Sequence, residues 1–321
     1  MKLSVVVALS LASQAYGTLL RGHGQRNGTK DPSTLAAPHA AANVSVQMAC
    51  LGALSSESLN DLLQASADAS QSQPTVDFLR TLRLCARCGD FERVGEPHDG
   101  GYIICADGLA NSGLQAAFSY GIQGRDGWGM DLASRYRLPL FEFDCFDHTR
   151  PTPCYGCQAT FVPECIKGNN EYKAVNYKTL SEHLAEHGYG HAADSSLLLK
   201  VDVEGAEWNV FSQESPHSLR QFRQINLELH DVGRTEQHAL YHQAMQAVLN
   251  AGFSVAHLHG NNHGHMAYFG QYMVPNFMEV TLIRQGGSGH CPADIPYRIP
   301  EDQTCNPVRG ELPNARLPSA L

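Results

Sequence analysis

Three acidic residues stand together where an apolar stretch ends in the middle of the chain. Residues 197–203 are nearly continuously apolar, as expected of a strand that is covered on both faces. Asp202, Glu204 and Glu207 come at its end, with Gly205 between them. Carboxylates beside a core strand are costly unless they have a partner such as a metal, a cationic ligand or substrate hydroxyls. We favour a functional cluster over a capping acid with solvated neighbours, because Gly205 permits close approach of a ligand.

A glycine-rich turn follows an earlier apolar stretch at residues 116–122. It reads Ser119-Tyr-Gly-Ile-Gln-Gly-Arg-Asp-Gly and leads into a predicted helix over 127–136. Tyr120, Gly121 and Gly124 are the candidate cofactor-binding residues here, because glycines let backbone approach a ligand and a helix N-terminus favours an anionic group. The spacing is not the GxGxxG pattern, so a plain turn before a helix is the alternative.

Asp144 stands at the end of the next predicted strand, over 140–145. An acid at the end of the second strand of a dinucleotide-binding sheet can accept both hydroxyls of a ribose. A capping or solvated acid is an equally good interpretation of this position.

Two histidines follow later predicted strands, His230 after 225–230 and His259 after 253–259. An imidazole titrates near neutral pH, so both are candidate general bases, with Glu204 as a third catalytic candidate. A hydrogen-bonded structural histidine is the alternative for each. For the histidine-rich stretch 257–265 we favour a mobile polar loop over a metal site.

The chain holds ten cysteines, and two pairs have CxxC spacing, Cys85 with Cys88 and Cys154 with Cys157. Four such thiolates can hold zinc, but in an oxidising compartment disulfides are the better interpretation. The sequence leaves the connectivity open, although Cys291 and Cys305 are candidates to staple the end of the chain.

The first residues of the chain indicate the oxidising compartment of the secretory pathway. Residues 1–17 combine a basic start, a short apolar run and small residues near Gly17, which predicts a signal peptide rather than a membrane span. Two N-glycosylation sequons follow, at Asn27 and Asn43. We expect a disulfide-bonded glycoprotein in the lumen of the secretory pathway or outside the cell, with no membrane span after signal cleavage.

Apolar runs alternate with helical stretches through most of the chain. The predicted strands cover 116–122, 140–145, 171–177, 197–203, 225–230, 253–259 and 277–284, and the predicted helices cover 127–136, 179–188, 206–212 and 235–250. This alternation predicts an α/β fold with a mostly parallel sheet and helices on both faces. Ligands of such sheets bind at the carboxyl ends of the strands, where all the candidate residues above stand.

We divide the chain into four parts. A signal peptide (1–17) precedes a low-complexity, mostly disordered linker (18–74), in which one short helix is predicted near 56–67. The catalytic domain covers 75–284, with its core at about 112–284, and an irregular proline-rich tail covers 285–321.

The stretch Lys200-Val-Asp-Val-Glu-Gly-Ala-Glu207 resembles the signature of FkbM-type S-adenosylmethionine-dependent methyltransferases. Further pieces resemble that family in the same order along the chain, from about Arg93 to Arg284. These are Asp99-Gly-Gly-Tyr102, Ser119-Tyr-Gly-Ile122, Phe143-Asp144, Leu227-Glu-Leu-His230, His257-Leu-His-Gly-Asn-Asn262 and Met278-Glu-Val-Thr-Leu-Ile283.

The resemblance implies a Rossmann-like, seven-stranded class I methyltransferase sheet with an antiparallel last strand. It implies S-adenosyl-L-methionine as cofactor, contacted by Gly121, Asp144 and the Asp202–Glu204 region, and methyl transfer to an oxygen. The stretch 149–170 looks like an insertion that shapes a substrate pocket of its own. In this interpretation we assign no metal ligand.

The net charge of −9 argues against nucleic acid or an anionic membrane as a partner. The function that the resemblance implies is O-methylation of a hydroxyl, and we expect the acceptor to be a small molecule or glycan. One alternative is a Mn²⁺-dependent glycosyltransferase that uses Asp202 and Glu204 as an Asp-x-Asp-like metal site. Another is a non-catalytic secreted protein that keeps the methyltransferase fold.

Overall fold

The protein is described here from a computed structural model that covers Asp68 and residues 72–152, 154, 156–169, 176–285 and 291–318. The predicted signal peptide, both sequons, the helix near 56–67 and most of the linker lie outside the described residues. The domain boundaries given above stay predictions.

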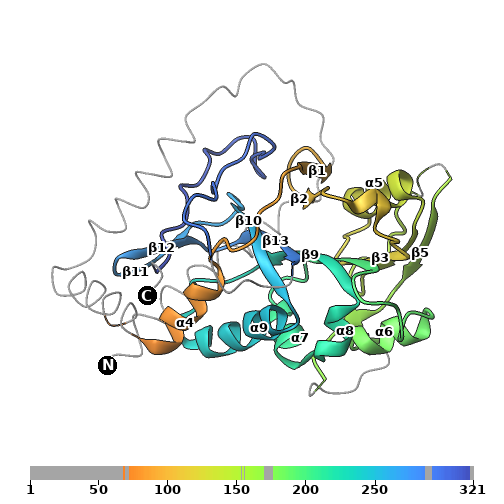
Figure 1. The fold of residues 1–321 in the computed structure, drawn as a ribbon, viewed down its shortest axis with the longest axis horizontal. Coiled ribbons are helices and arrows are strands. Elements are labelled where there is room, and N and C mark those ends of the chain that lie inside the picture. Colours follow the sequence, from red (N-terminus) through yellow and green to blue (C-terminus); the bar gives the residue numbers. More distant parts are fainter. Residues whose placement is uncertain are drawn as a thin grey trace, which may run out of the picture. The chain divides into compact units, whose positions relative to one another are not determined.

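A seven-stranded sheet forms the centre of the fold (Figure 1). The order across the sheet is β10–β13–β9–β8–β3–β4–β5, with parallel pairing from β9 to β5. β13 runs antiparallel to both of its neighbours. The strands are β3 (Ala116–Tyr120), β4 (Pro139–Phe143), β5 (Gln158–Val162), β8 (Leu197–Val201), β9 (Phe222–Leu229), β10 (Phe253–Gly260) and β13 (Met278–Arg284). The prediction of an α/β fold with a mostly parallel sheet is confirmed.

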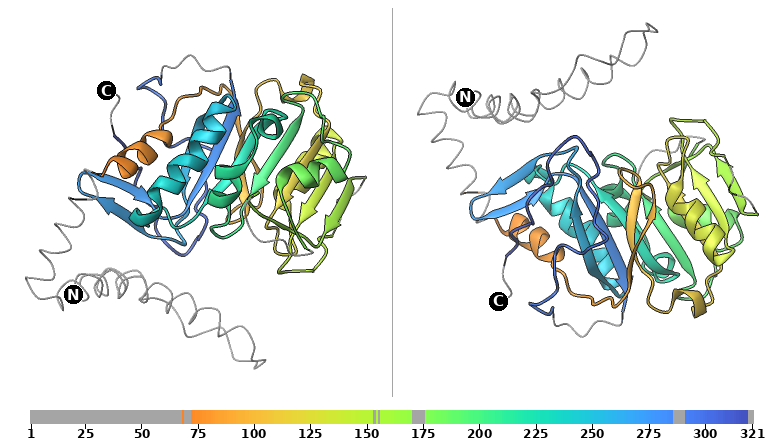
Figure 2. Two further views of the ribbon diagram at one scale, coloured as in Figure 1. Left: turned by 90° about the horizontal axis from the view of Figure 1, so that it is seen from below. Right: turned by 90° about the horizontal axis from the view of Figure 1, so that it is seen from above.

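Helices cover both faces of this sheet (Figures 1 and 2). One face carries α4 (Gln73–Thr81), α6 (Leu180–Glu186), α7 (Glu207–Gln213), α8 (Pro216–Arg220) and α9 (His238–Asn250). The other face carries α5 (Gly127–Tyr136). Short 3-10 turns lie at Leu109–Asn111 and Thr235–Gln237. The capping box expected at the start of α6 is present, since Thr179 and Glu182 bond each other's backbone amides.

A hairpin of β1 (Phe91–Gly95) and β2 (Gly101–Cys105) lies over the same face as α5. Polar side chains of the sheet fix this hairpin by hydrogen bonds to the backbone of β2. Asn226 Nδ2 and Thr281 Oγ1 donate to the Ile103 carbonyl at 2.8 and 2.6 Å. Gln224 bonds both backbone groups of Cys105. The part of this face under β2 therefore contains buried polar side chains, whereas the part under α5 is an apolar cluster that includes Trp128, Leu132 and Leu140.

The third strand of the sheet differs from the prediction. It is β5, within the stretch that we interpreted as an insertion, whereas the strand expected over 171–177 falls mostly outside the described residues. Tyr177 and Lys178 form the two-residue strand β7, which pairs with β6 (Cys165–Ile166) in a separate small sheet. The alternating, half-exposed burial of β5 is that of an edge strand, and such a strand lacks the continuous apolar run that identified its neighbours.

A hairpin that the sequence did not predict follows β10, after a short turn at residues 261–265. β11 (Met266–Phe269) pairs with β12 (Tyr272–Pro275), and Met273 pairs with Arg316 from the end of the chain. Residues 291–318 otherwise have irregular backbone. The tail thus packs against the domain instead of leaving it.

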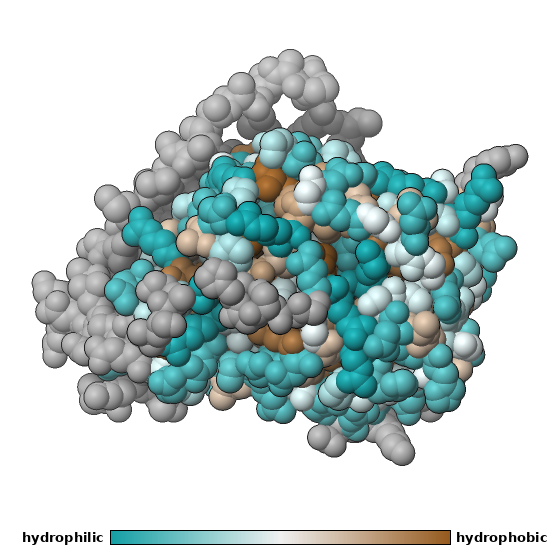
Figure 3. Space-filling model, in the orientation of Figure 1, coloured by the Kyte–Doolittle hydropathy of each residue, from teal (hydrophilic) through white to brown (hydrophobic). Residues whose placement is uncertain are grey.

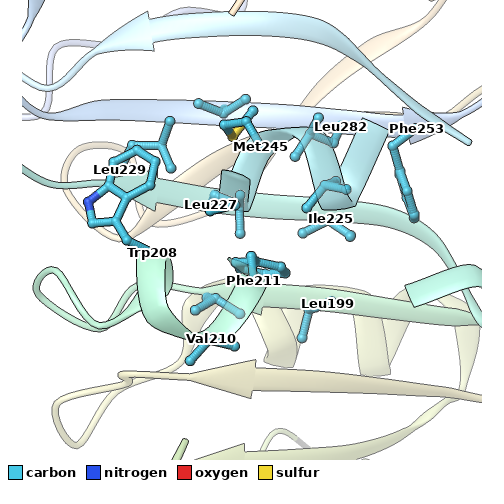
Figure 4. Close-up of a cluster of buried hydrophobic side chains, with 14 of the residues drawn as sticks. Leu199, Trp208, Val210, Phe211, Ile225, Leu227, Leu229, Met245, Phe253 and Leu282 are labelled. Atoms are coloured by element: carbon cyan, nitrogen blue, oxygen red, sulfur yellow. The ribbon is translucent and has the colours of Figure 1, made fainter. Parts of the chain in front are cut away.

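The main core lies between the sheet and the helices α4, α7 and α9 (Figure 4). Trp208 stacks on Tyr241 with ring centroids 3.9 Å apart, and its Nε1 donates to the His230 carbonyl at 2.9 Å. Figure 4 shows the apolar side chains of β8, β9 and β13 on this side of the sheet, among them Leu199, Leu227 and Leu282. Burial of this face fixes the register that places the polar residues opposite.

Four disulfides are present in the described part of the chain. Cys154 pairs with Cys157, as its spacing allows, but Cys85 and Cys88 do not pair with each other. They bond Cys291 and Cys105 instead, and Cys145 bonds Cys165. Cys291 therefore staples the tail as expected, whereas Cys305 is a buried free thiol.

The visible surface is mostly hydrophilic, with apolar residues in small separate patches (Figure 3). Among the helices of the described residues, none combines the length and the apolar character that a bilayer span requires.

Candidate functional site

The carboxyl ends of β3, β8 and β9 bring the candidate residues to one level of the sheet. Tyr120 is opposite Val201, and Val201 is opposite Leu227. The residues that follow these three in the chain are Gly121, Asp202 and Glu228. The sheet therefore places the glycine turn and the acidic cluster side by side, at the edge where ligands of α/β sheets bind.

The glycine turn packs tightly against the end of β8. Gly121 has φ +74°, and a Cβ there would lie 1.6 Å from the Asp202 carbonyl oxygen. Lys200, which is buried, donates to the Gly121 carbonyl at 3.0 Å and lies 3.3 Å from Asp202 Oδ2. Gly124 has φ +75° and also lacks room for a side chain. Gly121 thus lets this loop approach the end of β8, and Gly124 lets it approach Thr149 in the loop after β4.

Tyr120 contributes only its backbone to this site. Its ring stacks on Phe143 at 4.4 Å, and its hydroxyl lies 3.2 Å from His183 Nδ1 in the core. Successive side chains of a strand point to opposite faces of the sheet. The Tyr120 side chain points into the core on the side of α6, away from the strand-end site.

Asp144 is buried and holds the surrounding loops. Its Oδ2 accepts the Gln123 amide at 2.8 Å, and its Oδ1 accepts the Phe146 and Asp147 amides, each at 2.9 Å. A carboxylate offers about four acceptor sites, so one remains on Oδ2. This geometry leaves room for one ribose hydroxyl rather than two.

Strained backbone marks three of the strand ends. Gln123 after β3, Glu204 after β8 and Asp231 after β9 have φ values of 45°, 55° and 56°. Non-glycine residues rarely adopt positive φ, and such strain gathers at functional sites because the surrounding structure must hold it in place. The two other non-glycine residues with positive φ in the described chain, Arg137 and Ser195, are not at these ends.

Asp202 is held by two neighbours that our sequence reasoning missed. Tyr102 of β2 donates its hydroxyl to Asp202 Oδ2 at 2.9 Å, and Lys200 contacts the same oxygen. Oδ1 has no hydrogen bond within the described residues. The signal that could have identified Lys200 is its place inside an apolar strand, because a buried lysine requires an anionic partner.

His230 lies among acidic side chains. Its Nδ1 is 3.2 Å from Glu207 Oε1, and its Nε2 is 3.8 Å from Glu204 Oε2 and 3.9 Å from Glu228 Oε1. Burial alone lowers the pKa of His230, but the hydrogen bond and charge of Glu207, with the further charges of Glu228 and Asp202, raise it to about 10. The imidazole therefore carries a proton at neutral pH.

Glu228 is a buried acid at the end of β9 to which the sequence analysis assigned no role. Its Oε1 accepts from Asn261 Nδ2 at 2.7 Å, and the same amide group donates to Asp99 Oδ1 at 3.1 Å. Burial and the charge of Asp202 raise the pKa of Glu228 well above its usual value. Its position inside an apolar strand was the signal available, as for Lys200.

Comparisons with known proteins show that part of the chain is similar to a described protein family. Residues 155–255 match the family model described as the methyltransferase FkbM domain. A crystal structure of TrmN from Thermus thermophilus matches with a TM-score of 0.29 and 10% identity, over 54% of this chain. The match covers 44% of that structure, so the chain spans less than half of its length. No curated protein matches the chain.

The matched segment contains the acidic cluster and His230. Over residues 155–255, here called the FkbM segment, the chain is similar to the methyltransferase FkbM domain. The FkbM segment thus supplies one half of the strand-end site. Gly121 and Asp144 precede it in the chain, and His259 follows it.

His259 lies outside the cluster around His230. It stands on β10, which is separated from β9 by β13. Its Nδ1 is 3.2 Å from Glu279 Oε2, and its Nε2 is 2.8 Å from Glu311 Oε1 in the tail. Burial lowers the pKa of His259, but the bond and charge of Glu279, with other nearby acids, raise it to about 9.

The raised pKa values of His230 and His259 differ from the near-neutral titration expected of a general base, and the catalytic role of both histidines stays a prediction. A protonated ring cannot accept a proton. Of the three catalytic candidates, Glu204 is the exposed carboxylate beside His230, with 59% of its side chain accessible. Its Oε1 is 3.4 Å from Gln123 Nε2, and most of its side chain is open to solvent.

Proposed function

We propose that this chain is an S-adenosylmethionine-dependent methyltransferase of the secretory pathway that methylates a hydroxyl oxygen on a small molecule or glycan. The observation that carries the proposal is the approach of the Gly121 turn to the carboxyl end of β8, because β8 and the acidic residues after it lie in the segment that matches the FkbM domain. Four disulfides support an oxidising compartment.

The topology of the sheet supports the same proposal. Numbered in chain order, the strands from β5 to β9 read 3-2-1-4-5, which is the order of the doubly wound nucleotide-binding sheets. β10 and β13 are the sixth and seventh strands, with antiparallel β13 inserted between β9 and β10. The order reverses between β3 and β8, and ligands bind at such a switch point. Gly121 and Asp202 stand there.

The residues present fit the proposed cofactor. The Gly121 turn offers backbone without side chains, and Asp144 Oδ2 retains an acceptor site for a ribose hydroxyl. When bound, the cofactor supplies an electrophilic methyl group on a sulfonium. Lys200 and Tyr102 hold the Asp202 carboxylate, and Glu204 accepts the proton of the acceptor hydroxyl. The protein's main task is then alignment.

The test is calorimetric binding of S-adenosylmethionine and of its demethylated product to the secreted, disulfide-bonded chain. UDP-sugars with Mn²⁺ are titrated in parallel. We expect micromolar binding of the first pair only. Glu204→Gln should keep this binding, because the proposed role of Glu204 concerns the acceptor.

A binding-deficient variant completes the design. Gly121→Ala should lose the cofactor, since its Cβ displaces the turn from β8. Glu186→Gln, on the exposed side of α6, is the matched control and should bind normally. Binding of a sugar nucleotide alone would make the glycosyltransferase the better assignment. Binding of neither ligand would favour a non-catalytic protein with this fold.

A further inference from the structure

We propose that Asp202, Glu228 and His230 bind one divalent transition-metal ion, with Mn²⁺ as the probe ion. The three side chains come from the ends of β8 and β9, and their ligand atoms all lie within 4.8 Å of one another. His230 Nε2 is 3.9 Å from both Asp202 Oδ1 and Glu228 Oε1. One imidazole nitrogen with carboxylate oxygens is a donor set that suits Mn²⁺ or Zn²⁺.

The orientation of His230 points to an ion at its Nε2. Glu207 accepts the proton on Nδ1, so Nε2 faces the acidic oxygens. His230 is only 6% exposed, and the carboxylate oxygens nearest to its Nε2 in the described residues are 3.8–3.9 Å away, which is beyond hydrogen-bond distance. A carboxylate that fixes one ring nitrogen while the other faces a metal is the usual outer-shell arrangement of metal-binding histidines.

The two carboxylates are fixed with one oxygen turned towards the same point. Tyr102 and Lys200 both contact Asp202 Oδ2, which leaves Oδ1 on the side of His230. Asn261 holds Glu228 at 2.7 Å. The ligands are therefore positioned by neighbours that would remain in place when an ion binds.

The distances are close to those of a filled site. Ligand atoms at about 2.1 Å from one ion lie roughly 3.0 to 3.4 Å apart in octahedral or tetrahedral geometry. The observed separations of 3.9 Å exceed this by less than 1 Å. Small side-chain rotations can close the difference.

Charge balance favours a cation at this position. Glu207 is fully buried, Glu228 is 5% exposed, and Asp202 lies between them and the lysine ammonium of Lys200. Buried carboxylates are costly unless they are paired or bind a metal. Lys200 and the protonated His230 face these acids in the absence of an ion. A divalent ion would displace the Nε2 proton of His230 and replace its positive charge, so that binding should weaken as the pH falls.

The site is open where a substrate would enter. The side chain of Asp202 is 19% exposed and that of Glu204 is 59% exposed, so solvent reaches the cluster from that side. Three protein ligands leave coordination positions for water or for an acceptor hydroxyl. This role of the ion rests on the proposed methyltransferase function.

The ion would lower the pKa of the bound hydroxyl, as divalent ions do for water. Glu204 takes the proton. The oxygen then forms a bond to the methyl carbon while the carbon–sulfur bond breaks, and the positive sulfonium becomes a neutral thioether. No oxidant or reductant is needed.

A neighbouring cluster of His259, Glu279 and Cys305 is the competing location. Both ring nitrogens of His259 are within hydrogen-bond distance of a carboxylate, Glu279 on one side and Glu311 on the other. This ring has no open nitrogen. Glu279 is directly opposite Glu228 in the sheet register, which makes it a matched control.

The experiment is a Mn²⁺ titration of the full, disulfide-bonded chain after chelator dialysis, followed by electron paramagnetic resonance without cofactor. We expect one Mn²⁺ per chain. Asp202→Asn and Glu228→Gln should each weaken binding at least tenfold, whereas Glu279→Gln should bind as the wild type does. Circular dichroism of the metal-free variants checks that each is folded.

The possible outcomes distinguish a failure of the proposed metal site from a failure of the proposed methyltransferase function. Absence of Mn²⁺ binding to a chain that binds S-adenosylmethionine overturns the metal site alone. Loss of binding in Glu279→Gln but not in Glu228→Gln overturns it as well. Mn²⁺ binding that Asp202→Asn weakens supports the site, even if S-adenosylmethionine does not bind and the methyltransferase assignment falls.

Discussion

Some residues at the strand ends are candidates for function and are also restricted by the packing around them. Gly121 is the clearest example. Replacement by alanine places a methyl group 1.6 Å from the Asp202 carbonyl oxygen and strains a backbone with φ +74°. The loop must then move away from β8. We expect Gly121→Ala to lower the free energy of unfolding by about 2–4 kcal/mol, measured by urea denaturation.

Gly156→Ala is the matched control for that change. It also has positive φ, at 77°, but nothing lies within 4 Å of the added Cβ. It should therefore cost only the backbone strain, about 1 kcal/mol. Equal losses in the two variants would contradict the steric argument.

Glu142 makes stability depend on pH. It is buried on the same face as Asp126, and burial together with the charge of Asp126 raises its pKa from 4.5 to about 8. A raised folded-state pKa means that its contribution to stability is present below pH 4.5 and is lost as the pH rises towards 8. Glu142→Gln cannot lose a proton and should not show this loss.

The measurement is the melting temperature between pH 5 and pH 8.5. Relative to pH 5, the wild type should fall by about 2–6 °C more than Glu142→Gln, which corresponds to roughly 1–2 kcal/mol after screening. Glu236→Gln, at an exposed site, should follow the wild type. Parallel curves for wild type and Glu142→Gln would show that Glu142 is ionised throughout.

At the scale of elements, the sequence predicts those whose signals are local. The capping box of α6 and the apolar run of β8 need only neighbours in the chain, and both are found. β5 was missed because an edge strand is half exposed and carries no continuous apolar run. The site follows the same division: Asp202 and Gly121 were identifiable, whereas Tyr102 reaches Asp202 from a separate hairpin, a long-range contact that spacing cannot reveal.

The junction between β8, α7 and β9 depends on one buried acid. Glu207 Oε2 accepts the Gly205 amide at 2.9 Å, and Oε1 accepts the His230 amide at 2.7 Å. Glu207→Ala leaves the buried His230 amide and the partly buried Gly205 amide without this partner, and each costs about 1–3 kcal/mol, the Gly205 amide less than the His230 amide. We expect a loss of about 3–5 kcal/mol in chemical denaturation. Asp131→Ala, which removes one bond to the more accessible Gly95 amide, should cost less than half as much.

For the whole molecule, the Cys85–Cys291 disulfide joins the first described elements to the tail across 206 residues. A cross-link over so long a loop removes much of the entropy of the unfolded chain, up to about 5 kcal/mol, whereas the three-residue separation of Cys154 and Cys157 removes about 2 kcal/mol. The double variant Cys85→Ala with Cys291→Ala should therefore lose clearly more stability in urea than Cys154→Ala with Cys157→Ala. A larger loss in the short-loop variant would mean that local contacts around Cys154, rather than closure of the chain, govern the stabilisation.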